Sequence, residues 1–122
     1  MKPRIDGTVF GSITVEGTVF AHDVIIRPDG QVRKRKKKLS KRVYGTSHTI
    51  SLDEARYVYK EGAGADRLVV GGGQHGRVQL SPEAADYLAG KKCEVVLLPT
   101  PEVVDVWNEA KGSAIGLFHV TC

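Results

Sequence analysis

The first thirty residues alternate apolar and polar positions in the way that is typical of β-strands. Ile13 and Val15 lie in a stretch rich in Thr, Val and Phe, and an uninterrupted apolar run follows over Val24–Ile26. Pro28-Asp29-Gly30 marks a turn, because proline presets φ and glycine accepts a positive φ. Val32 begins a further strand that carries basic residues. We therefore predict a β-rich N-terminal part over residues 1–50.

From Ser51 onward the apolar spacing becomes helical and alternates with short strands. Ser51-Leu52-Asp53-Glu54 is a capping box, in which the serine oxygen accepts a free backbone N–H and the glutamate reaches back to the cap. Ser81-Pro82 and Thr100-Pro101 begin two further helices with a cap residue and an early proline. Strands are expected over residues 67–70, 77–80, 93–98 and 114–120. This alternation over residues 51–122 predicts an α/β sheet with helices packed on its faces.

The composition fits one ordinary globular domain of 122 residues, 41% hydrophobic and 26% charged. A chain of this length buries a core without metals or disulfides. No apolar run reaches the roughly 18 residues that a membrane helix needs, and the start MKPRIDGTVFGS lacks the apolar stretch of a signal peptide. We expect a cytoplasmic protein with no membrane partner, either a monomer or a weak homodimer.

The net charge of +4 comes from one stretch, Arg33–Arg42, which we call the basic segment. It holds eight of the 18 basic residues, and elsewhere ten basic residues face 14 acidic ones. One interpretation is a solvated hairpin edge, where lysines prevent edge-to-edge pairing. The other is a contact with nucleic acid or another acidic partner. Only Tyr44 is close in sequence, which does not support stacking on single-stranded bases. The candidate contacts are Arg33, Lys34, Arg35, Lys36, Lys37, Lys38, Lys41 and Arg42.

The stretch VVGGGQHG, residues 69–76, has the order G-x-G-x-x-G of a dinucleotide-binding loop. In that fold the third glycine opens a helix whose free N–H groups bind the pyrophosphate. Here Gly76 is followed by a predicted strand, and the next cap is Ser81. Glu94 begins a strand instead of ending one, and no G-K-[ST] follows, so neither a dinucleotide site nor a P-loop is expected. A tight strand-to-strand turn is favoured, with a nest of N–H groups for an anion as the alternative.

The histidines, cysteines and acidic residues do not form a recognisable catalytic or metal-binding set. His119 and Cys122 are three residues apart in a predicted strand, so they point to opposite faces, and no C-x-x-C is present. Ser81 and Thr100 are explained as helix caps. Asp105, Asn108 and Glu109 fit the solvated side of the third helix. We expect no metal, no cofactor and no enzymatic activity.

Cys93 opens one predicted strand and Cys122 closes another. If these strands are close and antiparallel, the two thiols lie at one edge of the sheet and could form a disulfide. Cytosolic chemistry favours two free thiols instead. Both alternatives stay open at this point.

Several stretches together resemble a known small family. They are the V-G-x-G turn at Val70–Gly73, L-S-P-E-A-A-D-Y-L at Leu80–Leu88, E-V-V-L-L-P-T at Glu94–Thr100, the helix ending V-W-N-E-A-K-G, the final G-L-F-H-V-T-C, and Ile13–Gly30 upstream. In order and spacing they resemble the adipogenesis-associated small-domain family of archaea, bacteria and vertebrates, which has mitochondrial complex I assembly factor 3 as a distant relative. The departure is the basic segment, where those relatives commonly carry tryptophan and acidic residues.

The resemblance implies a three-layer α/β single domain, whose mixed central sheet has helices on both faces, an antiparallel last strand and an N-terminal β-meander. It supports a Cys93–Cys122 pair and implies no established enzymatic activity. A role in protein assembly is what the distant mitochondrial relative implies.

Two main hypotheses follow for the function. The first is a non-enzymatic binding module, an adaptor or assembly factor, with a protein partner. The alternative is a small-molecule or anion site at the carboxyl ends of the strands. Nucleic-acid binding through the basic segment is third. The residues of the alternative site are Gly71, Gly73, Gln74, His75, Gly76, Thr100 and Asn108.

Overall fold

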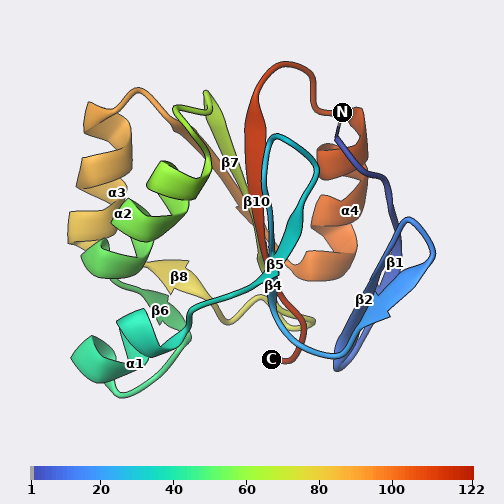
Figure 1. Ribbon diagram of the computed structural model, residues 1–122. Helices are drawn as coiled ribbons and strands as arrows, with labels where there is room; N and C mark the ends of the chain where they lie inside the picture. Colours follow the sequence, from blue (N-terminus) through green and yellow to red (C-terminus); the bar gives the residue numbers. More distant parts are fainter. Residues whose placement is uncertain (1) are drawn as a thin grey trace.

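A five-stranded sheet forms the middle layer of the computed structural model, which describes residues 2–122 (Figure 1). Its strand order is β5-β4-β10-β7-β9. β10 runs antiparallel to β4 and parallel to β7, and β7 runs parallel to β9. The mixed sheet predicted from the resemblance is confirmed, but its last strand, β10, is antiparallel only to β4 and runs in the same direction as β7 and β9. The five strands are β4 (Val24–Ile26), β5 (Val32–Lys34), β7 (Arg67–Gly72), β9 (Glu94–Leu98) and β10 (Ala114–His119).

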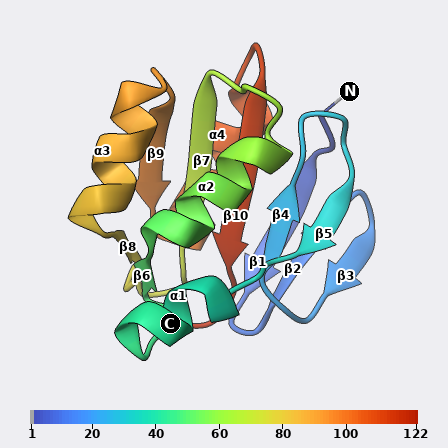
Figure 2. The ribbon, with the colours of Figure 1, turned by 60° about the vertical axis from the view of Figure 1, so that its left-hand side comes forward.

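Helices cover both faces of this sheet, as expected. α2 (Leu52–Glu61) and α3 (Pro82–Gly90) lie on one face, and α4 (Thr100–Glu109) lies on the other (Figure 2). The predicted caps of the first two are confirmed: the Ser51 and Ser81 side chains accept the backbone N–H groups of Glu54 and Ala84, at 3.1 and 3.0 Å. Each cap satisfies one of the N–H groups that a helix start leaves free.

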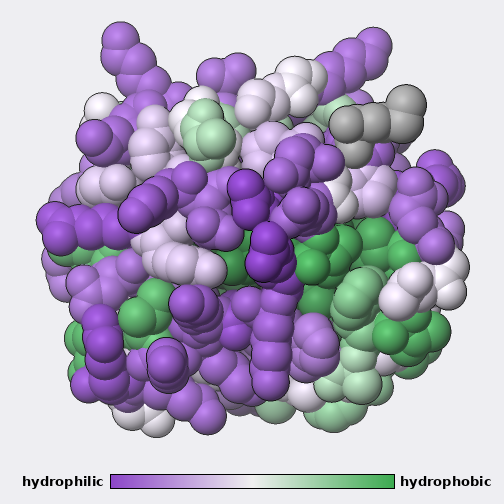
Figure 3. All heavy atoms as spheres, viewed as in Figure 1, coloured by the Kyte–Doolittle hydropathy of each residue, from purple (hydrophilic) through white to green (hydrophobic). Residues whose placement is uncertain are grey.

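The N-terminal β-meander forms a separate antiparallel sheet of β1 (Ile5–Val9), β2 (Ser12–Val15) and β3 (Thr18–Phe20). Its buried side chains join the core beneath α4, where Trp107 meets Phe118 edge-on at 5.6 Å. The outer side of this meander leaves Val9, Phe10 and Val19 at least 60% exposed. Apolar side chains accordingly gather on the right of the molecule, over α4 and β1–β2, and hydrophilic ones over α1–α3 (Figure 3).

The basic segment differs from the expected hairpin strand. β5 ends at Lys34, and the chain then turns into the short helix α1 (Lys38–Tyr44), which the sequence did not predict. After α1, β6 (Thr49–Ile50) pairs in parallel with β8 (Gln79–Leu80) as a two-stranded sheet. The prediction of a strand that carries the basic residues is therefore correct for Arg33 and Lys34 and wrong beyond them.

The two cysteines lie at opposite edges of the central sheet. β9 and β10 both run parallel to β7, so Cys93 precedes one strand at its amino end and Cys122 follows the other at its carboxyl end. Both thiols are free, and the bridge supported by the resemblance is not formed. Burial, and then the charge of Asp66, raise the pKa of the Cys93 thiol.

Among the described residues, no helix is both long enough and apolar enough to cross a bilayer.

Candidate functional site

Several buried ionisable side chains lie together at one edge of the central sheet. The carboxyl ends of β5, β7, β9 and β10 meet there with the amino end of β4, and we call this the carboxyl edge. Asp23 precedes β4, Arg35 follows β5 and His119 ends β10. Glu54, in the first turn of α2, completes a cluster of four ionisable side chains, each 5% exposed or less. We call these four residues the buried ionic cluster.

Arg35 is the centre of this cluster. Its Nε and Nη2 donate to the two carboxylate oxygens of Glu54 at 2.6 and 2.9 Å, and Nη2 also donates to the Ser47 carbonyl at 2.9 Å. Its Nη1 donates to Asp23 Oδ2 at 3.0 Å. Burial alone would lower the pKa of Arg35, but hydrogen bonds and charges from Glu54 and Asp23 raise it. The guanidinium therefore makes its hydrogen bonds to groups inside the protein.

Asp23 links Arg35 to the end of β10. Its Oδ2 lies 2.7 Å from His119 Nδ1, and its Oδ1 accepts the Val120 N–H at 2.9 Å. Burial would raise the pKa of Asp23, but the hydrogen bonds from His119 and Val120 and the charges of His119 and Arg35 together lower it to about 2. The other ring nitrogen of His119 lies 3.1 Å from Thr121 Oγ1. Both nitrogens of this imidazole are thus engaged.

Glu54 does not play the part that the capping box predicts. Instead of reaching back to the Ser51 N–H, its carboxylate accepts hydrogen bonds from Arg35 and from the Ser40 hydroxyl. The Ser51 N–H donates to Ser40 Oγ at 2.9 Å. The hydrogen bond that the capping box predicts between Glu54 and the Ser51 N–H is therefore absent, and Ser40 of α1 bonds to both of these residues instead. No local pattern in the sequence signals this exchange.

The remaining cations of the basic segment are exposed, in contrast to Arg35. Arg33 donates to the Gln31 side chain, and Arg42 lies 3.3 Å from Asp53. Within residues 2–122, none of the five lysines of the segment has a carboxylate within 4 Å. Lys34–Lys38 line an open hollow of about 390 Å³. The contact set predicted for an acidic partner therefore lies on the surface except for Arg35, and within it Arg42 already has Asp53 as a partner.

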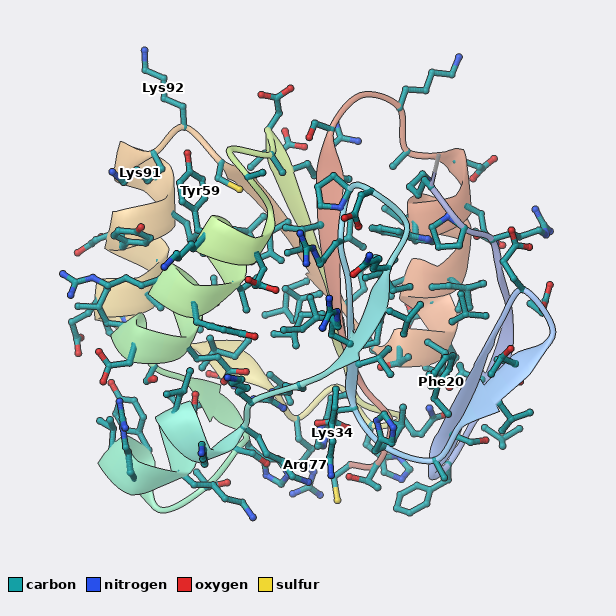
Figure 4. The ribbon with its side chains drawn as sticks, viewed as in Figure 1. Phe20, Lys34, Tyr59, Arg77, Lys91 and Lys92 are labelled. Carbon is teal, nitrogen blue, oxygen red and sulfur yellow. The ribbon has the colours of Figure 1, made fainter. Side chains whose placement is uncertain are left out.

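A further arginine lies at the same edge. Arg77 is found there with Lys34 of the basic segment, near the end of the chain (Figure 4). The ring of His48 meets that of His119 edge-on at 5.4 Å. Burial and then the positive charges of His119, Arg77 and Arg35 lower the pKa of His48. Burial and the neighbouring cations therefore both disfavour a positive charge on His48.

The glycine loop, residues 71–76, wraps around the end of the chain. The N–H groups of Gln74 and His75 donate to the carbonyls of Thr121 and Cys122, at 2.6 and 3.1 Å. Gly73 has φ +97°, and a Cβ there would lie 2.3 Å from the Cys122 carbonyl carbon. Arg77 and β8 follow instead of a helix. The loop has the form of a strand-to-strand turn, and internal carbonyls already occupy N–H groups that an anion would need.

The polar residues predicted to join this loop are placed in different ways. Thr100 is not a cap but the first residue of α4: its hydroxyl accepts the Gly73 N–H at 2.9 Å and donates to the His119 carbonyl at 2.6 Å. Gln74 Nε2 donates to Thr8 Oγ1 at 3.1 Å.

Asn108 is near the other end of α4, where its side chain amide accepts a hydrogen bond from the Ile5 N–H and donates one to the Ile5 carbonyl. The structure thus brings Thr100 to the loop and leaves Asn108 away from it.

The comparisons with known proteins agree with this fold. The family described as "Protein of unknown function (DUF498/DUF598)" matches residues 5–115. The chain belongs to the DUF498/DUF598 family. The description of this family assigns no activity to it.

Solved structures extend the comparison over almost the whole chain. A conserved hypothetical protein from Pyrococcus horikoshii is 33% identical with a TM-score of 0.89, and the match covers 98% of this chain and 99% of that one. The protein MT938 is 29% identical with a TM-score of 0.81, over 99% and 100% of the two chains. A Bordetella pertussis protein, described as a Mth938-like domain, is 16% identical with a TM-score of 0.63 over 97% and 85%, which shows the shared fold alone. The fold shared with the first two of these structures therefore covers 98–99% of this chain.

Proposed function

We propose that this DUF498/DUF598 protein is a non-enzymatic binding module that holds an acidic partner through the exposed cations of the basic segment. The observation that carries the proposal is the contrast within Arg33–Arg42. Arg35 is buried among carboxylates, whereas Lys34, Lys36, Lys37 and Lys38 are exposed and have no carboxylate within 4 Å in the part of the chain that the structure describes.

The buried ionic cluster gives the basic segment a fixed backbone on which to present these charges. Like charges held this close repel one another, which costs free energy in the isolated protein. An acidic partner relieves that repulsion and releases its own counterions, so its affinity falls as salt rises. Such a surface is suited to holding a partner.

An adaptor or assembly factor works in this way, by holding a partner instead of converting a substrate. The resemblance to the adipogenesis-associated family and to mitochondrial complex I assembly factor 3 supports such a role. We place the protein in the cytoplasm as a monomer or a weak homodimer. The alternative, a small ligand at the glycine loop, has less support because the chain itself occupies N–H groups of that loop.

The test compares two double variants that lower the net charge equally. Lys37→Gln/Lys38→Gln changes the basic segment, and Arg4→Gln/Lys111→Gln changes exposed cations elsewhere. We expect the first variant to leave an immobilised polyanion, heparin, at clearly lower salt than the wild type, and the second to elute close to the wild type. Equal shifts for both variants would mean that only net charge matters and would refute the proposal.

A further inference from the structure

All four tyrosines of the chain lie in the helical layer on one side of the sheet. Tyr44 is in α1, Tyr57 and Tyr59 are in α2, and Tyr87 is in α3. This layer continues the basic segment, since α1 packs against α2 and α2 against α3 (Figure 2). The sequence places only Tyr44 near the basic residues, but the fold brings the other three tyrosines onto the same side.

The spacing within α2 places its two tyrosines on opposite flanks of the helix. Residues two apart are separated by about 200° around a helix axis. Tyr57 therefore faces the basic segment, where Lys36 Nζ lies 4.9 Å from its ring centre. Tyr59 faces α3 and meets the Tyr87 ring edge-on at 6.0 Å. Arg56 and Lys60 lie exposed on the ridge between these flanks.

Further cations lie beside the ring of Tyr87. The Arg56 guanidinium carbon lies 5.8 Å and Lys91 Nζ 5.6 Å from its centre. Tyr59 points toward the end of the layer at which Lys91 begins the next turn (Figure 4). Rings and cations thus alternate across the layer from the basic segment to α3. We call the set Lys36, Tyr57, Arg56, Lys60, Tyr59, Tyr87 and Lys91 the tyrosine stripe.

Two carboxylates of the same layer already have partners. Asp53 lies 3.3 Å from an Arg42 nitrogen, and Glu83 accepts the Tyr44 hydroxyl at 3.2 Å. Asp86 is exposed on α3, so the stripe is not uniformly positive. The positive charge is densest at the basic segment, and the rings are densest between α2 and α3.

We infer that the acidic partner of the proposed function is a single-stranded nucleic acid, whose phosphates contact the basic segment and whose bases stack on the tyrosine stripe. Cation-lined paths with aromatic rings are how proteins hold single strands without reading sequence. The carboxylates of an acidic peptide would contact the cations, but such a peptide has no bases to stack on the rings. A duplex keeps its bases stacked inside, where tyrosine rings cannot reach them.

The experiment measures anisotropy of labelled oligo(dT) and oligo(U), each of twelve nucleotides, with the full chain, from low to moderate salt. A labelled oligoglutamate peptide of the same length and a DNA duplex are titrated alongside. The variants are Lys37→Gln/Lys38→Gln, Tyr57→Leu and Tyr87→Leu. Tyr57→Phe and Tyr87→Phe are the matched controls, because they keep the ring and remove only the hydroxyl. Thermal unfolding of each variant checks that the fold persists.

We expect the lysine variant to reduce the slope of log affinity against log salt by roughly 1.4, at about 0.7 for each phosphate contact. Each leucine variant should weaken oligonucleotide binding roughly tenfold without changing that slope, and the phenylalanine variants should retain binding. If the oligoglutamate peptide or the duplex binds as tightly, or if leucine and phenylalanine behave alike, the single-strand inference fails and the basic segment remains a polyanion contact. If no polyanion responds to the lysine variant, the proposed function fails as well.

Discussion

The basic segment and the glycine loop lie at the same edge of the sheet and use their polar groups in opposite ways. The glycine loop carries a sequence pattern typical of ligand binding, but N–H groups of Gln74 and His75 are occupied by carbonyls of Thr121 and Cys122. The basic segment could be explained as a solvated edge, yet it holds exposed lysines that have no carboxylate within 4 Å among residues 2–122. A polar group is available to a partner only when the fold has not already satisfied it.

The comparison also shows how one residue of a charge run can differ from its neighbours. Arg35 pairs with Glu54 and Asp23 inside the protein, whereas the lysines on either side of it are exposed. The buried ionic cluster and the exposed lysines are thus neighbouring parts of the structure with different expected roles. The first should matter for stability and the second for binding, and the following predictions test that division.

The largest effect is expected for Arg35→Met. Removing one partner of a buried ion pair leaves Glu54 charged and uncompensated, so the free energy of unfolding should fall by about 3–5 kcal/mol. The matched control is Arg42→Met, whose pair with Asp53 is exposed and should contribute at most about 1 kcal/mol. Urea denaturation measures both. Similar small losses for the two variants would show that the buried ionic cluster does not anchor the segment.

The next effect tests the glycine loop. Gly73→Ala adds a Cβ that would lie 2.3 Å from the Cys122 carbonyl carbon, at a φ of +97°. We expect a loss of about 3 kcal/mol, because strain and crowding add up. Gly112→Ala is the control: its φ is +82° but its Cβ would meet nothing within 4 Å, so about 1 kcal/mol is expected. If thermal melts rank the two variants equally, the loop does not enclose the chain end as tightly as the structure indicates.

Much of the fold was predictable because its signals are local. The Ser51 and Ser81 caps and the apolar runs of β9 and β10 are each read within a few neighbouring residues, and they are confirmed. α1 was missed because it has seven residues and no side-chain cap at Lys37. Its Ser40 is held instead by Glu54, fourteen residues away. A helix stabilised in this way leaves no mark in its own sequence.

The site was less predictable because its contacts span long separations. Arg35 reaches Asp23 over 12 residues and Glu54 over 19, and Asp23 reaches His119 over 96. Nothing in RKRKKKLSKR distinguishes the second arginine from its neighbours. Thr100 has the same difficulty, since its position before proline fits a cap while its hydroxyl joins Gly73 to His119. Hydrophobic periodicity and helix caps involve residues close together in the sequence, so they cannot predict hydrogen bonds between residues that are far apart in it.

A third prediction concerns acid unfolding. The pKa of Asp23 is lowered from 3.8 to about 2, so its charged form stabilises the fold above about pH 4. This contribution, about 2 kcal/mol, should be lost as the pH falls from about 4 to about 2. Asp23→Asn should be less stable than the wild type near neutral pH. Its free energy of unfolding should also fall less steeply than that of the wild type between about pH 4 and pH 2. Asp29→Asn, at an exposed position, should keep the acid limb of the wild type. An unchanged acid limb in Asp23→Asn would place the titration elsewhere.

The smallest effect is the one that best separates the two parts of the segment. Lys37→Gln/Lys38→Gln removes two exposed charges that have no carboxylate within 4 Å in the described residues, so the free energy of unfolding should change by no more than about 0.5 kcal/mol. Relief of repulsion between neighbouring lysines would make the change slightly stabilising. A loss above about 1 kcal/mol in urea denaturation would assign these lysines a structural role like that of Arg35. A near-zero change, together with weaker polyanion binding, would mean that their charge contributes to binding and not to folding.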